Sequence, residues 1–111
     1  MINWLPLENE EQLQNAIQSS SESPIVIFKH STRCFISKMA LRNFESEFAQ
    51  NNTKSYLLDL INYRSISNDI AQQLEIQHQS PQLLIVSNGK VIHSSTHENI
   101  DGTLASKIVL E

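Results

Sequence analysis

The sequence predicts an α/β fold in which a central four-stranded mixed sheet is flanked by helices, with an extra N-terminal helix in front. Apolar strand-like runs alternate with amphipathic helical segments, an order that places strands in parallel. Asn88-Gly89 separates two further strand-like runs, and this pair favours a tight hairpin. The 111 residues, 40% of them hydrophobic, fit one domain over residues 1–111 with a single core.

Each element follows from its own pattern of residues. Residues 7–20 are predicted to be helical because Leu13, Ala16 and Ile17 share one face. The later segments show buried apolar runs or apolar residues at helical spacing. Their predicted order is strand, helix, strand, helix, strand, strand, helix, at residues 25–28, 34–49, 56–60, 65–75, 83–86, 91–94 and 99–110. Trp4 precedes them, and we expect it to pack beneath the first helix.

The chain contains one cysteine, Cys34, which lies where a predicted strand leads into the first turn of a predicted helix. Helix N-termini present unpaired N–H groups and a partial positive charge, and both stabilise an anion such as a thiolate. Cys34 is therefore a candidate nucleophile. A lone cysteine is more often inert packing, so the surrounding residues have to decide between the two roles.

Basic residues are concentrated around this cysteine, although the protein has 8 basic and 12 acidic residues and a net charge of −4. The stretch from position 29 to position 42 contains no acid and four basic residues, Lys29, Arg33, Lys38 and Arg42. A cationic neighbourhood favours a thiolate and attracts anionic partners. Arg33, next to the cysteine, is the better candidate for a direct role, since Lys38 and Arg42 also fit a solvated helix face.

Ser37 stands three residues after Cys34, where dithiol oxidoreductases carry their second cysteine. A serine hydroxyl does not undergo thiol–disulfide exchange. It can donate a charge-assisted hydrogen bond to the Cys34 sulfur, or it can bond to the helix backbone, as serines near helix starts often do. The sequence therefore predicts a one-cysteine redox site in which Ser37 assists the thiol.

The order of elements resembles that of the thioredoxin-like superfamily. Within it, the stretch Phe28-Lys29-His30-Ser31-Thr32-Arg33-Cys34, with Ile36-Ser37 and His78-Gln79-Ser80-Pro81-Gln82, resembles the monothiol bacilliredoxins of the bacillithiol system (the YtxJ type). Residues 95–97 and 99–100 are also similar to the end of that family's sequences. One position departs from it, because Phe35 follows the cysteine where the family commonly has proline. This change restores a backbone N–H and adds apolar bulk.

The resemblance implies thiol–disulfide exchange with mixed disulfides between proteins and bacillithiol, an anionic thiol that carries a malate unit. The partners would be S-thiolated proteins and small anionic thiols, with the small thiol as co-substrate and no resident cofactor. Cys34, Arg33 and Ser37 are the candidate catalytic residues. The resemblance also implies a cis Ser80–Pro81 bond facing Cys34, which leaves the Ser80 backbone free to pair with an extended substrate. The candidate substrate-binding residues are Thr32, Phe35, Ser80, Pro81 and His30.

A second functional class stays open beside this one. In it the protein is a thioredoxin-like binding module, an extended peptide lies in the groove at Pro81, and Cys34 is a passive or regulatory thiol. A fast-reacting thiol would favour the oxidoreductase, and peptide affinity without such reactivity would favour the binding module.

Other features of the sequence argue against a bound metal or iron–sulfur cluster, a membrane span and a signal peptide. The four histidines, His30, His78, His93 and His97, lack a compact ligand spacing, so we expect no metal. Phe35 replaces the glycine of cluster-binding monothiol glutaredoxins, and no double glycine follows the hairpin, so we expect no iron–sulfur cluster. No apolar run approaches a membrane span, the start lacks signal-peptide features, and one cysteine cannot form an internal disulfide. We expect a cytoplasmic protein with neither a nucleic-acid nor a membrane partner.

Overall fold

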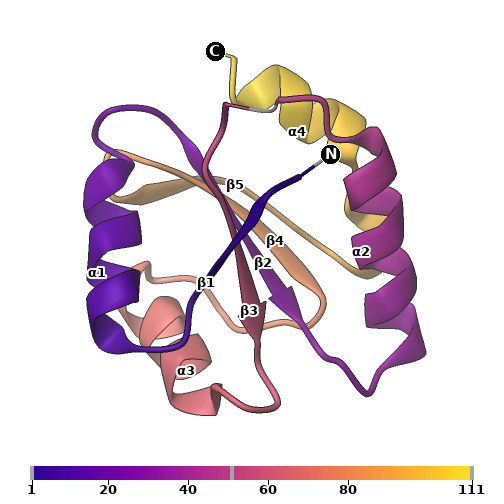
Figure 1. The fold of residues 1–111 in the computed structure, drawn as a ribbon, viewed down its shortest axis with the longest axis horizontal. Coiled ribbons are helices and arrows are strands. Elements are labelled where there is room, and N and C mark those ends of the chain that lie inside the picture. Colours follow the sequence, from indigo (N-terminus) through magenta and orange to yellow (C-terminus); the bar gives the residue numbers. More distant parts are fainter. Residues whose placement is uncertain (1, 51, 111) are drawn as a thin grey trace.

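A computed structural model describes residues 2–50 and 52–110, and in it one twisted sheet is covered by helices on both faces (Figure 1). Apart from β1, the helices and strands follow one another in the predicted order. The elements are β1 (Trp4–Pro6), α1 (Glu10–Ser19), β2 (Ile25–His30), α2 (Phe35–Glu47), β3 (Ser55–Asp59), α3 (Arg64–Gln73), β4 (Gln82–Ser87), β5 (Lys90–Thr96), a short 3₁₀ turn (His97–Asn99) and α4 (Gly102–Ile108).

The sheet has the strand order β1-β3-β2-β4-β5. β1, β3 and β2 are parallel, and β4 runs antiparallel to both of its neighbours, β2 and β5. The sequence predicted four strands, and the fifth is β1, whose three residues pair with β3 at the edge. A strand this short shows no alternating pattern, so no pattern of residues predicts it.

Trp4, on β1, corrects a second expectation. It packs against Phe28 and Phe44 with ring centroids 6.1 Å away in each case, on the side of the sheet opposite α1. Its indole Nε1 donates a hydrogen bond to Glu45 Oε2 at 2.8 Å. Trp4 therefore joins the edge strand to α2, and does not lie beneath the first helix.

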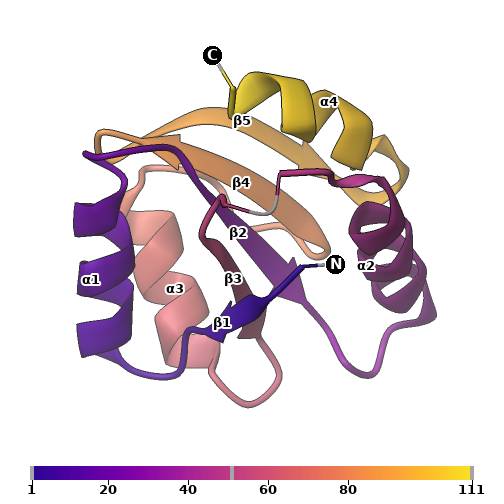
Figure 2. The same ribbon diagram turned by 45° about the horizontal axis from the view of Figure 1, so that its top comes forward.

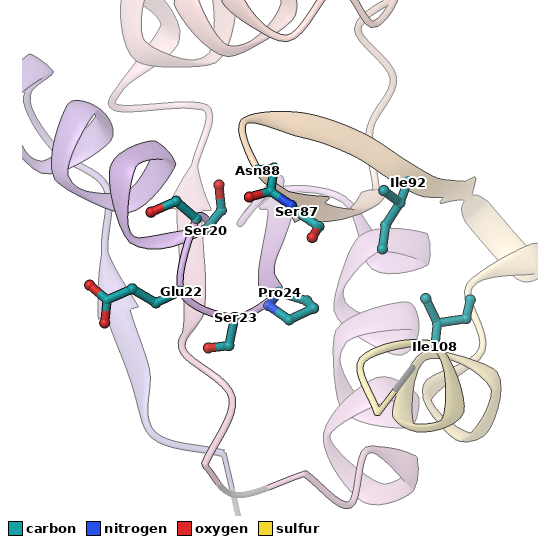
Figure 3. A pocket seen from close by; sticks show the side chains of 9 residues that line it. Ser20, Glu22, Ser23, Pro24, Ser87, Asn88, Ile92 and Ile108 are labelled. Carbon is teal, nitrogen blue, oxygen red and sulfur yellow. The ribbon is translucent and has the colours of Figure 1, made fainter.

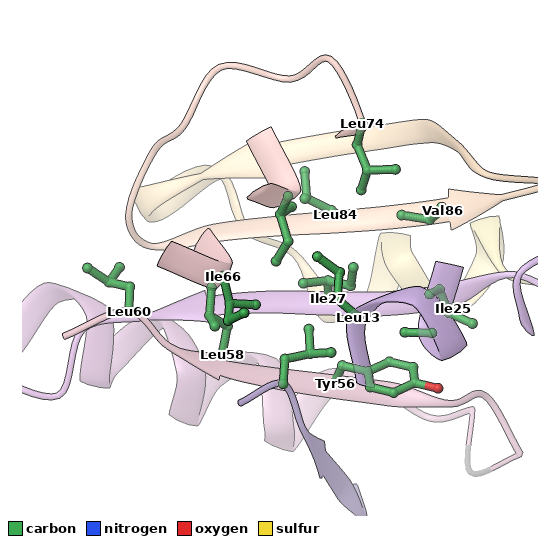
Figure 4. Close-up of a cluster of buried hydrophobic side chains, with 13 residues drawn as sticks. Leu13, Ile25, Ile27, Tyr56, Leu58, Leu60, Ile66, Leu74, Leu84 and Val86 are labelled. Carbon is green, nitrogen blue, oxygen red and sulfur yellow. The ribbon is translucent and has the colours of Figure 1, made fainter. Parts of the chain in front are cut away.

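Two apolar clusters hold the layers together, one on each face of the sheet. Figure 2 shows the two helical layers, with α1 and α3 on one face and α2 and α4 on the other. Successive residues of β2 point to opposite faces, so Ile25 and Ile27 join the cluster under α1 and α3, drawn in Figure 4, whereas Val26 and Phe28 join the cluster under α2 and α4. All six residues of β2 are buried. The central strand is thus fixed on both sides, and its carboxyl end leads directly to Cys34.

Capping residues set the helix ends and shorten two of the predicted helices. Asn9 caps α1, accepting a hydrogen bond from the Gln12 N–H at 2.9 Å, so this helix begins at Glu10. Asp101 caps α4 by accepting from the Thr103 and Leu104 N–H groups. None of the helices in the described ranges combines the length and apolar character needed to cross a bilayer.

Candidate active site

Cys34 occupies the N-cap position of α2, one residue before the helical turn in which the sequence placed it. A tight turn carries the chain from β2 to this point, with the Cys34 N–H bonded to the Ser31 carbonyl at 3.2 Å. The Cys34 carbonyl accepts the first bond of the helix, from the Lys38 N–H at 3.0 Å. The side chain caps no N–H of the described residues, and it is a free, partly exposed thiol. Its sulfur therefore stays available beside the unpaired amides of the first helical turn.

Ser37 is fully buried behind the cysteine and ties the two ends of this turn together. Its Oγ accepts a hydrogen bond from the Ser31 N–H at 3.0 Å and lies 2.7 Å from Nδ1 of His30. The hydrogen bond that the sequence predicted from Ser37 to the Cys34 sulfur is not among those formed by the described residues. Ser37 instead fixes the shape of the turn that presents the thiol.

His30, the last residue of β2, contacts Ser37. It is 8% exposed at the end of β2, so the structure gives it little surface for the substrate contact expected from the sequence. Burial lowers the pKa of its imidazole, which favours the neutral ring near neutral pH. His30 acts on the turn through its bond to Ser37.

Exposed apolar side chains border the cysteine on the α2 side. Phe35 is 74% exposed and Ile36 55% exposed, and both line a groove of about 320 Å³ that continues to Met39 and His97. Thr32 and Arg33 are exposed on the turn itself. Phe35, which replaces the expected proline, thus presents an aromatic surface directly beside the thiol.

The Ser80–Pro81 bond is cis, as expected. The Pro81 carbonyl accepts a hydrogen bond at 3.2 Å from the N–H of His97, a residue that lines the groove beginning at Phe35. The sequence did not single out His97 as part of a site. Ser80 Oγ is enclosed without a hydrogen-bond partner among the described residues. Pairing of the Ser80 backbone with a substrate remains a prediction.

Fewer basic residues are exposed around Cys34 than the sequence predicted. Arg33, Lys38 and Arg42 are exposed, but Lys29 is fully buried on the α1 and α3 face. Burial lowers the pKa of Lys29 to about 8. The sequence did contain the signal, because Lys29 follows Ile25 and Ile27 at every second position and so shares their face.

A separate hollow of about 470 Å³ lies at the opposite end of β2, beside Pro24 and the hairpin turn (Figure 3). Ser20, which lines this hollow, already forms hydrogen bonds within the fold. Its carbonyl accepts from the Asn88 N–H at 2.8 Å, and its Oγ accepts from the Gly89 N–H at 2.9 Å. No group of three or more His, Cys, Asp or Glu side chains that could hold a metal ion occurs within residues 2–50 and 52–110.

A sheet of this order, with a free thiol at the N-cap of α2 and a cis-proline before β4, defines a thiol oxidoreductase of the thioredoxin fold. The chain matches the family Monothiol bacilliredoxin BrxC over residues 5–104 and belongs to that family.

Several solved structures share the fold of this chain. A protein provisionally described as an oxidoreductase with a thioredoxin fold is 27% identical, with a TM-score of 0.77, 91% of this chain covered and 89% of the other. A mutant thioredoxin from Halobacterium salinarum shares the fold at 11% identity with a TM-score of 0.69, and the match covers 95% of this chain and 86% of the other. A thioredoxin from Malassezia sympodialis shares it at 18% identity with a TM-score of 0.70, and the match covers 97% of this chain and 89% of the other.

Proposed function

We propose that this protein removes bacillithiol from mixed disulfides on other proteins, with Cys34 as the nucleophile. The observation that carries the proposal is the free, partly exposed thiol of the single cysteine, held at the N-cap of α2 in a chain of the monothiol bacilliredoxin family.

The exchange has two steps. The Cys34 thiolate attacks the bacillithiol sulfur of the mixed disulfide, forms a new disulfide with bacillithiol and releases the protein thiolate, which takes up a proton from water. A second bacillithiol thiolate then attacks the bound bacillithiol sulfur, giving bacillithiol disulfide and free Cys34. The second thiol is required because Ser37 stands at the position of a resolving cysteine.

The surroundings of the thiol fit the two halves of such a substrate. Arg33, Lys38 and Arg42 are exposed and cationic on the turn and on α2, which suits the malate carboxylates of bacillithiol. The apolar groove that begins at Phe35 and the loop of Ser80 and Pro81 suit the extended segment of the modified protein.

The test uses one peptide carrying either bacillithiol or glutathione in a mixed disulfide. After incubation with the reduced protein, intact mass spectrometry should show the bacillithiol adduct on Cys34 and free peptide, formed faster than the glutathione adduct. Cys34→Ser is the negative control, and Arg33→Gln should slow the bacillithiol reaction more than the glutathione reaction. Equal rates with both thiols would contradict the preference for bacillithiol. If the protein forms no adduct with either thiol, the binding module at the Pro81 groove becomes the better explanation.

A further inference from the structure

A buried polar cluster lies on the sheet face opposite Ser37, beneath the loop that carries Pro81. Its centre is Lys29, whose side chain is fully buried among apolar residues of β2. A buried ammonium is destabilising unless its protons are hydrogen-bonded. Nζ lies 3.1 Å from the Ser67 carbonyl of α3, to which it donates, and 3.2 Å from Nδ1 of His78. Lys29 thus joins the central strand to α3 and to the loop before β4.

The contacts of His78 define its protonation state. Lys29 Nζ and Ser67 Oγ both approach Nδ1, at 3.2 and 3.4 Å. The ammonium has protons to donate and no lone pair, so Nδ1 accepts and the ring proton is on Nε2. Burial is the largest influence that lowers the pKa of His78, followed by the cationic Lys29 and Arg64.

A second pair of hydrogen bonds holds the same loop from β4. Gln82 is buried and is the cross-strand partner of Lys29. Its Nε2 donates to the Gln77 carbonyl at 3.0 Å, and its Oε1 accepts from the Gln79 N–H at 3.4 Å. The loop is therefore held on both sides of His78, two residues before Ser80.

We propose that Lys29 and His78 are positioning residues, which hold residues 77–80 in the shape that pairs with the substrate's extended chain, and that protonation of His78 releases this loop. The inference rests on the proposed function. A proton on Nδ1 would turn the acceptor into a donor that faces the Lys29 ammonium, so the hydrogen bond from Lys29 would be lost. The Ser67 hydroxyl would still accept from the new N–H, so the bond to the central strand is the one that breaks. The groups that face His78 are Lys29 from β2 and Ser67 and Arg64 from α3, so no carboxylate among them favours the imidazolium.

The direction of the pH effect follows from the lowered pKa of His78. Above pH 6.5 the ring is neutral and the loop is held. As the pH falls below 6.5 and through the lowered pKa, the loop is released, so KM for a peptide substrate rises. The rate constant of the chemical step, which depends on Cys34, is expected to follow a separate profile.

The test compares Lys29→Met, His78→Leu and His78→Gln with the wild-type protein, using a peptide–bacillithiol mixed disulfide. Lys29→Met and His78→Leu should raise KM about tenfold, a loss of roughly 1.4 kcal/mol of binding, with kcat and the rate of Cys34 alkylation by iodoacetamide changed less than about twofold. His78→Gln keeps an acceptor for Lys29, so it should restore most of the wild-type KM and remove its rise between pH 7 and pH 5. His93→Gln on β5 is the matched control and should change none of these values.

Two measurements separate this inference from a merely structural role and from the proposed function. Lys29→Met removes the cost of burying an ammonium but leaves the Ser67 carbonyl and His78 Nδ1 without its protons. These two effects oppose each other, so the variant should unfold at nearly the same urea concentration as wild type although its KM is raised. Amide hydrogen exchange at residues 77–80 should be faster in Lys29→Met, and nitrogen NMR should show the His78 proton on Nε2 at pH 7.

Three results would overturn the inference: an unchanged KM in Lys29→Met and His78→Leu, unchanged exchange in the loop, or a His78 proton on Nδ1 at pH 7. A wild-type protein that transfers no thiol would refute the proposed function, and loop exchange and the His78 tautomer would then decide on the positioning role.

Discussion

Ser37 shows how one side chain sets both the chemistry and the geometry of the site. Its position is that of a resolving thiol, and its hydroxyl cannot take that role. It is also fully buried, with hydrogen bonds to the Ser31 N–H and to His30 Nδ1. Replacements at this residue therefore separate the reactivity of the cysteine from the stability of the turn that presents it.

Ser37→Cys should make the mixed disulfide on Cys34 short-lived. The new thiolate would attack the Cys34 sulfur, form an internal disulfide and release the small thiol, so the protein would no longer need a second thiol. Intact mass spectrometry after loading with bacillithiol disulfide should show the adduct persisting in the wild type and lost from the variant. Ser37→Ala is the control and should keep the adduct, and an equally persistent adduct in Ser37→Cys would contradict the prediction.

Ser37→Ala should lower the free energy of unfolding by about 1–3 kcal/mol, because it leaves the buried His30 Nδ1 and the half-buried Ser31 N–H without their partner. Urea unfolding measures this loss. Ser46→Ala, which removes an exposed hydroxyl bonded to the Asn43 carbonyl of the same helix, should change stability by less than about 0.5 kcal/mol. Similar losses in both variants would show that the buried bonds of Ser37 are not special.

For single residues, the sequence predicted the place of each in the fold better than its hydrogen-bond partners. The place of Cys34 at the start of a helix could be inferred from the apolar spacing around it, and the cis bond before Pro81 from the resemblance to thioredoxin-like proteins. The partner of Ser37 could not, because His30 meets it through the packing of β2 against α2. Charge alone places Lys29 in the cationic neighbourhood of Cys34, whereas the alternation of side chains along β2 places it with Ile25 and Ile27 on the face covered by α1 and α3.

Among the elements, α4 lies against the end of α2 in close contact at Gly102. A Cβ at this residue would lie 2.7 Å from Glu47 Cβ and 2.9 Å from both the Phe44 carbonyl oxygen and the Phe48 nitrogen. Two of these three neighbours are backbone atoms, one in α2 and one in its C-cap residue, so they cannot move aside as a flexible side chain would. The contact fixes the far end of that helix.

Gly102→Ala should therefore lower the free energy of unfolding by about 1–3 kcal/mol, the usual range for overpacking a tight contact. Thermal unfolding followed by circular dichroism measures it. Thr103→Ala, at the neighbouring exposed position of α4, is the matched control and should have little effect. A stabilised Gly102→Ala variant would show that the two helices can separate without loss.

The elements themselves were largely predictable, and their ends were not. Apolar spacing locates the central strands and all four helices, and Asn88 and Gly89 adopt the positive φ angles, 52° and 73°, that a tight hairpin requires. The helix ends depend on which polar side chain reaches a free N–H, as Asn9 and Asp101 do. The edge strand β1 depends on pairing with β3, which the sequence of three residues does not encode.

In the whole molecule, the two faces of the sheet contribute differently to one end of β2. The α2 face provides the thiol and the turn held by Ser37 and His30. The α1 and α3 face provides Lys29 and His78 beneath the loop of Pro81. His30 is buried and His78 is half-buried, and loss of solvent around each ring lowers its pKa. The stability of the fold is therefore linked to pH through both faces.

Stability should fall as the pH decreases from about 6.5, the ordinary histidine value. Below it the unfolded chain binds protons at His30 and His78 that the folded protein still excludes, and the free energy of unfolding decreases wherever the unfolded state binds more protons. The loss continues until the pH passes through the lowered folded values. Each histidine contributes at most about 1.4 kcal/mol per pH unit. Urea unfolding at pH 7, 6 and 5 should show this decline, and His30→Gln and His78→Gln should each make it shallower. A wild-type stability that is constant or increases from pH 7 to pH 5 would mean that these two rings become protonated in the folded protein as easily as in the unfolded chain.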